Sequence, residues 1–244
     1  MQEKLALKQA YTDWTAHQAE QFADHDTGMK QAIGGQFEAF GIIEREMLRF
    51  YGLPDDGYLI DIGCGSGRLA LPLSVTREAR YLGTDLVAFA RNAATREDWR
   101  FEVVERLEIP EADNVADAMC FFSVMTHLLH EQSYLYLEEA KRVAKPGGFV
   151  LFSFLEFAMD FHWEVFRNTV NDARGQNQHP LNVFISRDAI AAWARHLDME
   201  LVDIRDGSEP FVPLPHPVTL EDGRVMEGFG NLGQSICVLR KCGG

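Results

Sequence analysis

Three glycines at alternate positions directly follow a short apolar run in the first third of the chain. The run is "YLIDI", and Gly63, Gly65 and Gly67 come after it, with Asp61 as its one charged residue. Glycine weakens regular structure, so this spacing indicates a backbone that turns sharply or passes very close to something. At the carboxyl end of a buried strand, such a turn would approach a ligand and direct its amide N–H groups toward it. We therefore expect a binding loop over residues 61–67.

The spacing of the glycines distinguishes between the common nucleotide-binding loops. The dinucleotide fingerprint G-x-G-x-x-G would require glycine at position 68 or 70, where the chain has Arg68 and Ala70. A phosphate-binding P-loop is excluded because no Gly-Lys-Ser/Thr follows the turn. What remains is an acidic residue followed by x-G-x-G-x-G.

Short apolar runs alternate with helical segments after residue 57, and this alternation predicts an α/β fold with a parallel sheet and helices on both faces. Lys145–Gly148, "KPGG", is expected to form the stop and turn between a helix and a strand. Two later strands, joined by a proline-containing stretch, are expected to be antiparallel neighbours at the sheet edge. The expected strands are 58–62, 80–86, 100–105, 115–124, 148–157, 199–206 and 234–241, and the expected helices are 67–76, 87–95, 130–144 and 186–197.

The first part of the chain carries helical patterns and no strand signal. One helical face is predicted from apolar residues at three- and four-residue spacing, namely Phe37, Phe40, Ile43, Met47 and Phe50. We therefore divide the chain into an N-terminal helical cap, 1–53, and a larger domain, 54–244. The mixed segments near 160–183 and 207–232 interrupt the alternation, and we expect them to be lid insertions.

Composition narrows the class of partner. The formal net charge is −14, from 23 basic and 37 acidic residues, and no basic run is visible. This disfavours nucleic acid and favours a small-molecule partner, with the protein itself a monomer or homodimer. No apolar run approaches the roughly 20 residues that span a bilayer, and the N-terminus lacks the apolar centre of a signal peptide. The four cysteines fall singly, so we expect reduced thiols, no metal site, no membrane partner and a cytoplasmic location.

The Asp61–Gly67 segment resembles the first motif of the class I S-adenosylmethionine-dependent methyltransferases. The resemblance covers roughly residues 58–155 and resumes at 184–240. It implies a Rossmann-like, seven-stranded, mostly parallel sheet with an antiparallel edge strand, and S-adenosyl-L-methionine as the cofactor. In that family the glycines let the loop approach the methionine part of the cofactor, and the acidic residue of the motif lies near the amino group of that methionine part.

Further positions of the family pattern also have counterparts in this chain. Asp85 ends the second strand, where the resemblance implies a carboxylate that grips both ribose hydroxyls; alternatively it only caps a helix beginning at Leu86. Glu105 follows the third strand, where the resemblance implies a contact near the adenine amino group, although the path of the chain from Arg106 onward is not fixed by the sequence. The other cofactor-binding positions implied by the resemblance are Cys64, Leu86, Arg106 and Ser123.

The methyl acceptor is less clearly indicated. His127 and His130 follow the fourth strand, and a histidine there could take a proton from a phenol, an enol or a ring N–H as a catalytic base. Packing roles explain both histidines equally well. The N-terminal helices and the insertions are rich in aromatic residues, which suit a planar acceptor or simply the burial of a lid. The candidate substrate-binding residues are Tyr11, Trp14, Phe157 and Trp163.

Three functions remain open from the sequence. The favoured one is methyl transfer to an O or N atom of a small metabolite, with a planar aromatic or heterocyclic ring as the favoured class, in biosynthesis. The second is methylation of a sugar or lipid-linked saccharide. The third is a protein that binds the cofactor without turnover.

Overall fold

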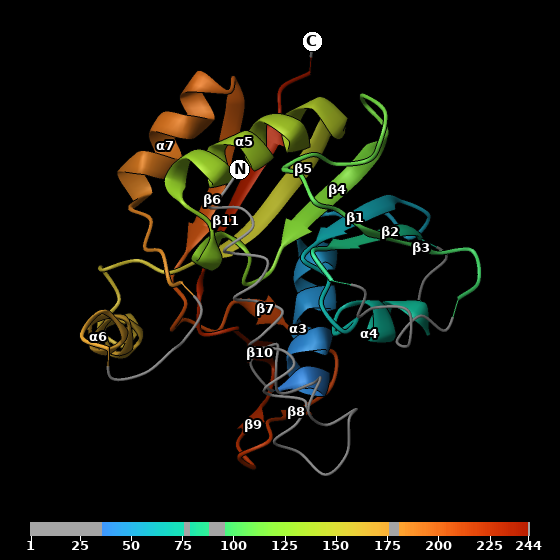
Figure 1. The fold of residues 1–244 in the computed structure, drawn as a ribbon. Coiled ribbons are helices and arrows are strands. Elements are labelled where there is room, and N and C mark those ends of the chain that lie inside the picture. Colours follow the sequence, from blue (N-terminus) through green and yellow to red (C-terminus); the bar gives the residue numbers. More distant parts are fainter. Residues whose placement is uncertain (1–35, 76–78, 88–95, 176–180, 244) are drawn as a thin grey trace.

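The computed structural model describes residues 36–75, 79–87, 96–175 and 181–243. Its centre is a seven-stranded sheet with the strand order β3-β2-β1-β4-β5-β11-β6 (Figure 1). The strands are β1 (Tyr58–Ile62), β2 (Arg80–Asp85), β3 (Arg100–Val103), β4 (Ala116–Phe121), β5 (Ala144–Phe154), β6 (Met199–Arg205) and β11 (Ser235–Lys241).

The sheet is mostly parallel, as predicted. Strands β1 to β5 pair in parallel, whereas β11 runs antiparallel to both of its neighbours, β5 and the outermost strand β6. The strand order reverses between β1 and β4, and the carboxyl ends of both strands meet at one edge of the sheet. In open α/β sheets this switch point is where ligands bind, so the fold places residues 61–67 at the expected location.

Helices cover both faces of the sheet, which explains why its central strands are apolar on both sides. One face packs against α5 (His130–Val143) and α7 (Arg187–His196). The other packs against α3 (Phe37–Phe50) and the short helix α4 (Ala70–Ser74). Helix α7 begins as the sequence predicts, because the hydroxyl of Ser186 accepts a hydrogen bond from the amide of Ala189.

The predicted face of α3 is correct except at its end. Phe37, Ile43 and Met47 are buried, and Phe40 is partly buried. Phe50 is 47 % exposed, so its prediction as a buried residue was wrong. The helix ends at this residue, and its ring makes edge contacts with the aromatic side chains of Tyr51 and Phe211 rather than entering the core.

Two predicted boundaries also differ from the structure. Helix α4 begins at Ala70, not at Gly67, and this places Pro72 in the first turn, where its missing amide is not needed. Lys145–Gly148 lies within the bounds of β5 and bulges out opposite the single residue Asp117 of β4. The ammonium group of Lys145 lies 2.7 and 2.8 Å from the two carboxylate oxygens of Asp117, which ties the bulge to β4.

The two insertions differ in how they join the body. The region 207–232 forms two small antiparallel ribbons, and its residues Val212, Leu214 and Val218 are buried with α3. The described residues of the region 160–183 include α6 (His162–Ala173), which Figure 1 shows standing away from the sheet at the lower left. The ribbon strands are β7 (Val212–Pro213), β8 (Val218–Thr219), β9 (Val225–Met226) and β10 (Phe229–Gly230).

Within the described ranges, no helix combines the length and the apolar character that crossing a bilayer requires.

Candidate cofactor and acceptor site

The glycine loop needs glycine for its backbone conformation. Gly63, Gly65 and Gly67 have φ values of 72°, 52° and 89°, in the left-handed region that other residues avoid. Space is also restricted, because a Cβ atom on Gly63 would lie 2.3 Å from the side chain of Val124. Val124 follows β4, so the loop after β1 and the segment after β4 are in direct contact.

The amides of this loop bond within the protein, which corrects the expectation that they point toward a ligand. The N–H groups of Gly63 and Cys64 both donate to the carbonyl oxygen of Thr84, at 2.7 and 3.1 Å. The amide of Gly67 donates to the carbonyl of Cys64. The glycines therefore allow a ligand to lie close to the loop backbone, but they do not offer it a set of free amide donors. A cofactor without phosphate groups needs only this close backbone contact.

Asp85 is joined to the loop through its carboxylate. One oxygen accepts the amide hydrogen of Gly65 at 2.9 Å, and the other accepts that of Val87 at 3.3 Å. Burial raises the pKa of Asp85 to about 6, although these amide bonds oppose the shift. Because a carboxylate accepts about four hydrogen bonds, both oxygens retain capacity for two hydroxyl donors. This pair of acceptor oxygens fits the vicinal diol of a ribose.

Asp61 lies beneath the loop, on the face of the sheet that packs against α3. Its carboxylate accepts a hydrogen bond from the hydroxyl of Tyr81 at 2.7 Å and one from the thiol of Cys120 at 3.5 Å. Burial raises the pKa of Asp61 to about 7, and the carboxylate of Glu44 acts in the same direction. Asp61 is thus a buried group that joins β1 to its two neighbouring strands.

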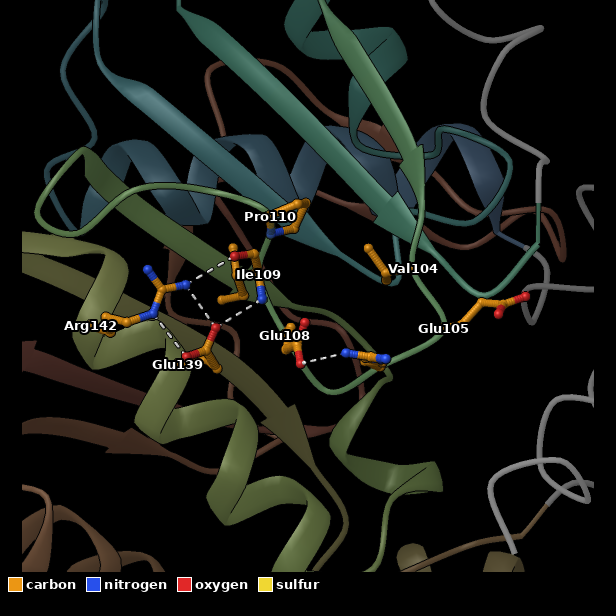
Figure 2. A pocket seen from close by; sticks show the side chains of 8 residues that line it. Val104, Glu105, Glu108, Ile109, Pro110, Glu139 and Arg142 are labelled. Carbon is orange, nitrogen blue, oxygen red and sulfur yellow. Dashed lines mark hydrogen bonds and ion pairs between the residues drawn. The ribbon is translucent and has the colours of Figure 1, made fainter. Parts of the chain in front are cut away.

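The remaining predicted cofactor positions are spread over the loop itself and the segments that follow β2, β3 and β4. Cys64 is buried, and its sulfur packs so closely on Gly83 that a Cβ atom there would lie 2.9 Å away. Leu86 lies in the bend after β2. Glu105 and Arg106 are exposed in the connection between β3 and β4, and Figure 2 shows Glu105 directed away from the other labelled side chains.

A cleft of about 560 Å³ opens beside that connection, between it and α5 (Figure 2). The guanidinium of Arg142 crosses its wall and donates to the carboxylates of Glu139 and Asp113 and to the carbonyls of Ile109 and Glu111. All five of its N–H groups are therefore engaged within the protein. Arg142 holds the β3–β4 connection against α5, where no helix intervenes, and we assign the cleft no ligand.

Ser123 follows β4 in a left-handed conformation, with φ of 58°. Its amide donates to the hydroxyl of Ser153 on β5 at 2.7 Å, and its hydroxyl accepts from the side-chain amide of Gln234 at 3.1 Å. The side-chain oxygen Oε1 of Gln234 is buried and has no hydrogen-bond partner among the residues that the structure describes. Gln234 precedes β11 and carried no motif, so sequence reasoning missed this contact.

Both candidate histidines bond to the same segment, 181–185. The Nδ1 atom of His127 lies 2.6 Å from the carbonyl oxygen of Leu181, and the Nε2 atom of His130 lies 3.1 Å from that of Phe184. Because a carbonyl only accepts, the bonded nitrogen of each ring carries a hydrogen. Burial lowers the pKa of His127, so its ring is neutral at pH 7 with Nε2 unprotonated. His130 packs edge-on against Trp193 of α7.

Four aromatic side chains pack together into a group that we call the aromatic cluster. Its members are Phe157 after β5, Trp163 and Phe166 of α6, and Phe184. The rings of Phe157 and Phe184 stack, with centroids 4.6 Å apart and an interplanar angle of 14°. Phe157 and Trp163 are 59 % and 52 % exposed. The structure thus brings these two predicted residues close to the segment that holds both histidines. Tyr11 and Trp14 lie outside the described residues.

An ion pair between the buried Glu156 and the partly exposed Arg187 lies after β5, directly before Phe157 in the chain. The guanidinium of Arg187 donates to both carboxylate oxygens of Glu156, at 2.8 and 2.7 Å, and also bonds Asp206. The hydroxyl of Ser235 adds a further bond to Glu156. This network joins β5, α7 and β11 beneath Phe157. Neither Glu156 nor Arg187 stands in a recognisable motif, so no local pattern indicated this network.

Comparison with known proteins agrees with this geometry. A family described as a methyltransferase domain matches residues 37–204. The chain belongs to this methyltransferase-domain family. The domain is a class I S-adenosylmethionine-dependent methyltransferase domain, and the predicted fold and cofactor class are confirmed at this level.

Individual relatives of this methyltransferase domain are distant. A tRNA (carboxymethyluridine(34)-5-O)-methyltransferase of Arabidopsis thaliana is 29 % identical over 100 residues, covering 41 % of this chain and 24 % of its own length. A ubiquinone biosynthesis O-methyltransferase of Hahella chejuensis is 26 % identical over 162 residues, covering 60 % and 64 %. The chain therefore spans less than two thirds of either relative.

Solved structures show the same fold. The magnesium protoporphyrin IX methyltransferase of Synechocystis PCC 6803, with bound SAH, is 13 % identical, with a TM-score of 0.58 over 94 % of each chain.

Proposed function

We propose that this protein transfers a methyl group from S-adenosylmethionine to an oxygen or nitrogen atom of a small metabolite with a planar ring. The observation that carries the proposal is the convergence of both candidate histidines and the aromatic cluster on segment 181–185, beside the carboxyl ends of β4 and β5. The cofactor supplies a methyl group on a sulfonium sulfur, and the chain has to hold it, align the acceptor and exclude water.

On the cofactor side, the proposal assigns the ribose to Asp85 and the close backbone approach to the loop 63–67. The carboxylate of Asp85 has capacity for a diol, and the loop has no side chain at its three glycine positions. Asp61 stabilises the strand from which the loop departs. Leu86, Ser123, Glu105 and Arg106 remain the proposed rim of the site.

On the acceptor side, the proposal assigns the ring of the metabolite to the aromatic cluster. Exposed faces of Phe157 and Trp163 offer offset or edge-on contacts to a planar molecule, each worth about 0.5–1.5 kcal/mol. A saccharide would be better matched by polar walls. The ubiquinone-pathway relative, named as an O-methyltransferase, also favours an oxygen acceptor.

Of the two histidines, we propose His127 as the general base. Its hydrogen-bonded Nδ1 fixes the ring, its unprotonated Nε2 is the proton acceptor, and its lowered pKa keeps it neutral at pH 7. His130 has its ring engaged by Phe184 and Trp193, which suits a packing role. A proton would move from an acceptor hydroxyl or N–H to Nε2 of His127.

The distant tRNA methyltransferase raises nucleic acid as a competing acceptor. The net charge of −14 opposes it, because binding a polyanion requires a basic surface.

The direct test is methyl transfer from radiolabelled S-adenosylmethionine to four groups of acceptors: phenols and quinols, N-heterocycles, saccharides, and bulk tRNA. We expect labelled product in the first or second group, confirmed by mass spectrometry. If only saccharides or only tRNA became labelled, the proposed acceptor class would be wrong. If the protein bound the cofactor but labelled no acceptor, the result would favour a protein that binds the cofactor without turnover.

A further inference from the structure

Three residues of α3 converge on Arg68, the residue that directly follows the glycine loop. The carboxylate of Glu44 lies 2.6 Å from the guanidinium of Arg68, and the ring of Phe40 lies under the same guanidinium at 5.9 Å. Between them, Gly41 packs so tightly that a Cβ atom there would lie 2.3 Å from the carbonyl oxygen of Arg68. Helix α3 therefore contacts both the backbone and the side chain of Arg68.

The ion pair is almost completely removed from solvent. The side chain of Glu44 is 1 % exposed, and that of Arg68 is 10 % exposed. Burying a charge is costly, and either of these charges left without the other would be strongly unfavourable. The pair consequently restricts where Arg68 can lie relative to α3.

Arg68 connects the cofactor loop to the helix that follows it. The residue before it, Gly67, donates its amide to Cys64 within the loop, and its carbonyl accepts the amide of Leu71 in α4. Any displacement of Arg68 would therefore shift both the left-handed turn at Gly67 and the start of α4. The negative charge of Glu44 raises the pKa of Asp61, and the positive charge of Arg68 lowers it. The ion pair is therefore close enough to the end of β1 to act on it electrostatically.

The far end of α3 is held by the insertion 207–232. The carboxylate of Glu221 accepts the amide of Phe37 at 3.2 Å, and the side chain of Gln36 accepts the amide of Glu221 at 2.8 Å. Helix α3 is thus fixed at its amino end by this insertion and fixes Arg68 in its middle.

We propose that Glu44 is a positioning residue for the cofactor: through Arg68 it holds the glycine loop in its binding conformation. Glu44 itself does not contact the cofactor. The proposal rests on S-adenosylmethionine being bound by the loop, as proposed above, and it extends the cofactor site to a helix outside the family motif.

Glu46 on the same helix provides a matched control. It is also buried and ion-paired, with its carboxylate 2.7 Å from Arg45 and 3.5 Å from Arg49. Both partners of Glu46 belong to α3 itself, and Arg45 also donates to the carbonyl oxygen of Pro72 in α4 at 3.2 Å. Neutralising Glu46 therefore removes a buried ion pair near α4 while the contacts of Glu44, Phe40 and Gly41 to Arg68 stay in place.

The experiment is calorimetric titration with S-adenosylhomocysteine of the wild type, Glu44→Gln, Arg68→Gln, the double variant and Glu46→Gln, each well below its melting temperature. We expect each single change in the Glu44–Arg68 pair to weaken binding about 10- to 100-fold. The double variant should be no weaker than the worse single variant, and Glu46→Gln should stay within about threefold of wild type. Additive losses, or an affinity of Glu44→Gln equal to that of Glu46→Gln, would overturn the proposal.

Amide hydrogen exchange without ligand gives a second readout that does not depend on binding. Glu44→Gln should accelerate exchange at the amides of Gly67 and Leu71, whereas Glu46→Gln should not. Unchanged protection at both amides would overturn the proposal even if affinity fell. If the wild type does not bind S-adenosylhomocysteine, the proposed function fails, and faster exchange in Glu44→Gln would still show that the pair holds the loop.

Discussion

The proposed cofactor side and the proposed acceptor side of this protein are built in opposite ways. Around Asp61 and Asp85 the polar groups are buried, and hydrogen bonds within the protein fix both carboxylates. Around Phe157, which follows β5, and Trp163, on a helix that stands away from the sheet, the exposed groups are aromatic rings. The first arrangement suits one invariant ligand held by backbone geometry. The second suits an acceptor selected by shape and stacking.

Variants that change one side alone test whether the two sides have these separate roles. A substitution on the acceptor side should alter turnover and leave cofactor affinity unchanged, whereas one on the cofactor side should alter affinity first. The expected effects range from several orders of magnitude down to a few-fold.

The largest effect is expected from the proposed base. His127→Gln should lower kcat by about 10²–10⁴ with an acceptor that must lose a proton, because the proposed proton acceptor, Nε2 of His127, is removed. His130→Gln serves as the matched control and should remain within a few-fold of wild type. The two variants should bind S-adenosylhomocysteine equally well. Equal turnover of His127→Gln and wild type would show that alignment alone suffices.

A large effect on the cofactor side is expected from Gly63→Ala. The new methyl group would meet Val124 at 2.3 Å, on a backbone with φ of 72°. We expect S-adenosylhomocysteine affinity to fall about 100-fold or more, from strain and displacement of the loop. Gly147→Ala is the control, since Gly147 has φ of 81° but, in the part of the chain that the structure describes, only its chain neighbours lie within 4 Å of where its Cβ would stand. Unchanged affinity in folded Gly63→Ala would contradict the proposed loop.

The raised pKa of Asp61 gives a stability prediction for the ligand-free protein. Between pH 4 and about 7 the unfolded carboxylate is ionised while the folded one keeps its proton, so stability falls as pH rises through this window and levels off above it. In Asp61→Asn, the free energy of unfolding should fall less between pH 4 and 7 than in the wild type, by an amount on the order of 2–4 kcal/mol. Urea unfolding at several pH values measures it. A wild-type minus variant difference that does not vary with pH would show that the carboxyl is not perturbed.

The smallest effect is expected from the aromatic cluster. Trp163→Ala should raise KM for a planar acceptor about 2- to 12-fold, the range for one aromatic contact, with little change in kcat. Phe229→Ala is a suitable control, because Phe229 is similarly exposed but lies on β10. If both variants behave alike, the cluster does not bind the acceptor.

The sequence allowed the sheet, its two helical faces and the glycine loop to be predicted because each depends on local pattern. Asp61, Gly63, Gly65, Gly67 and Asp85 stand at fixed offsets from strand ends, and the parallel sheet brings those ends together. The predicted buried face of α3 wrongly included its last residue, Phe50. The spacing of apolar residues does not show where a helix leaves the core.

The contacts that join distant segments could not be predicted. Glu44 with Arg68, Glu156 with Arg187 and Ser123 with Gln234 are separated by many residues, and none has a local signal. Their partners are set by how helices and insertions pack on the sheet. The inward direction of the loop amides was missed for the same reason, because it depends on Thr84 and Asp85 of the neighbouring strand.

The central claim is that Asp85 and the glycine loop hold the cofactor, and calorimetric titration with S-adenosylhomocysteine tests it most directly. We predict micromolar binding to the wild type and a loss of about 1.5–3 kcal/mol in folded Asp85→Ala, as for hydrogen bonds to a charged group. Asp117→Ala, which removes a carboxylate paired with Lys145 away from the loop, should bind as wild type does. No heat at millimolar ligand, or unchanged affinity in Asp85→Ala, would contradict the account.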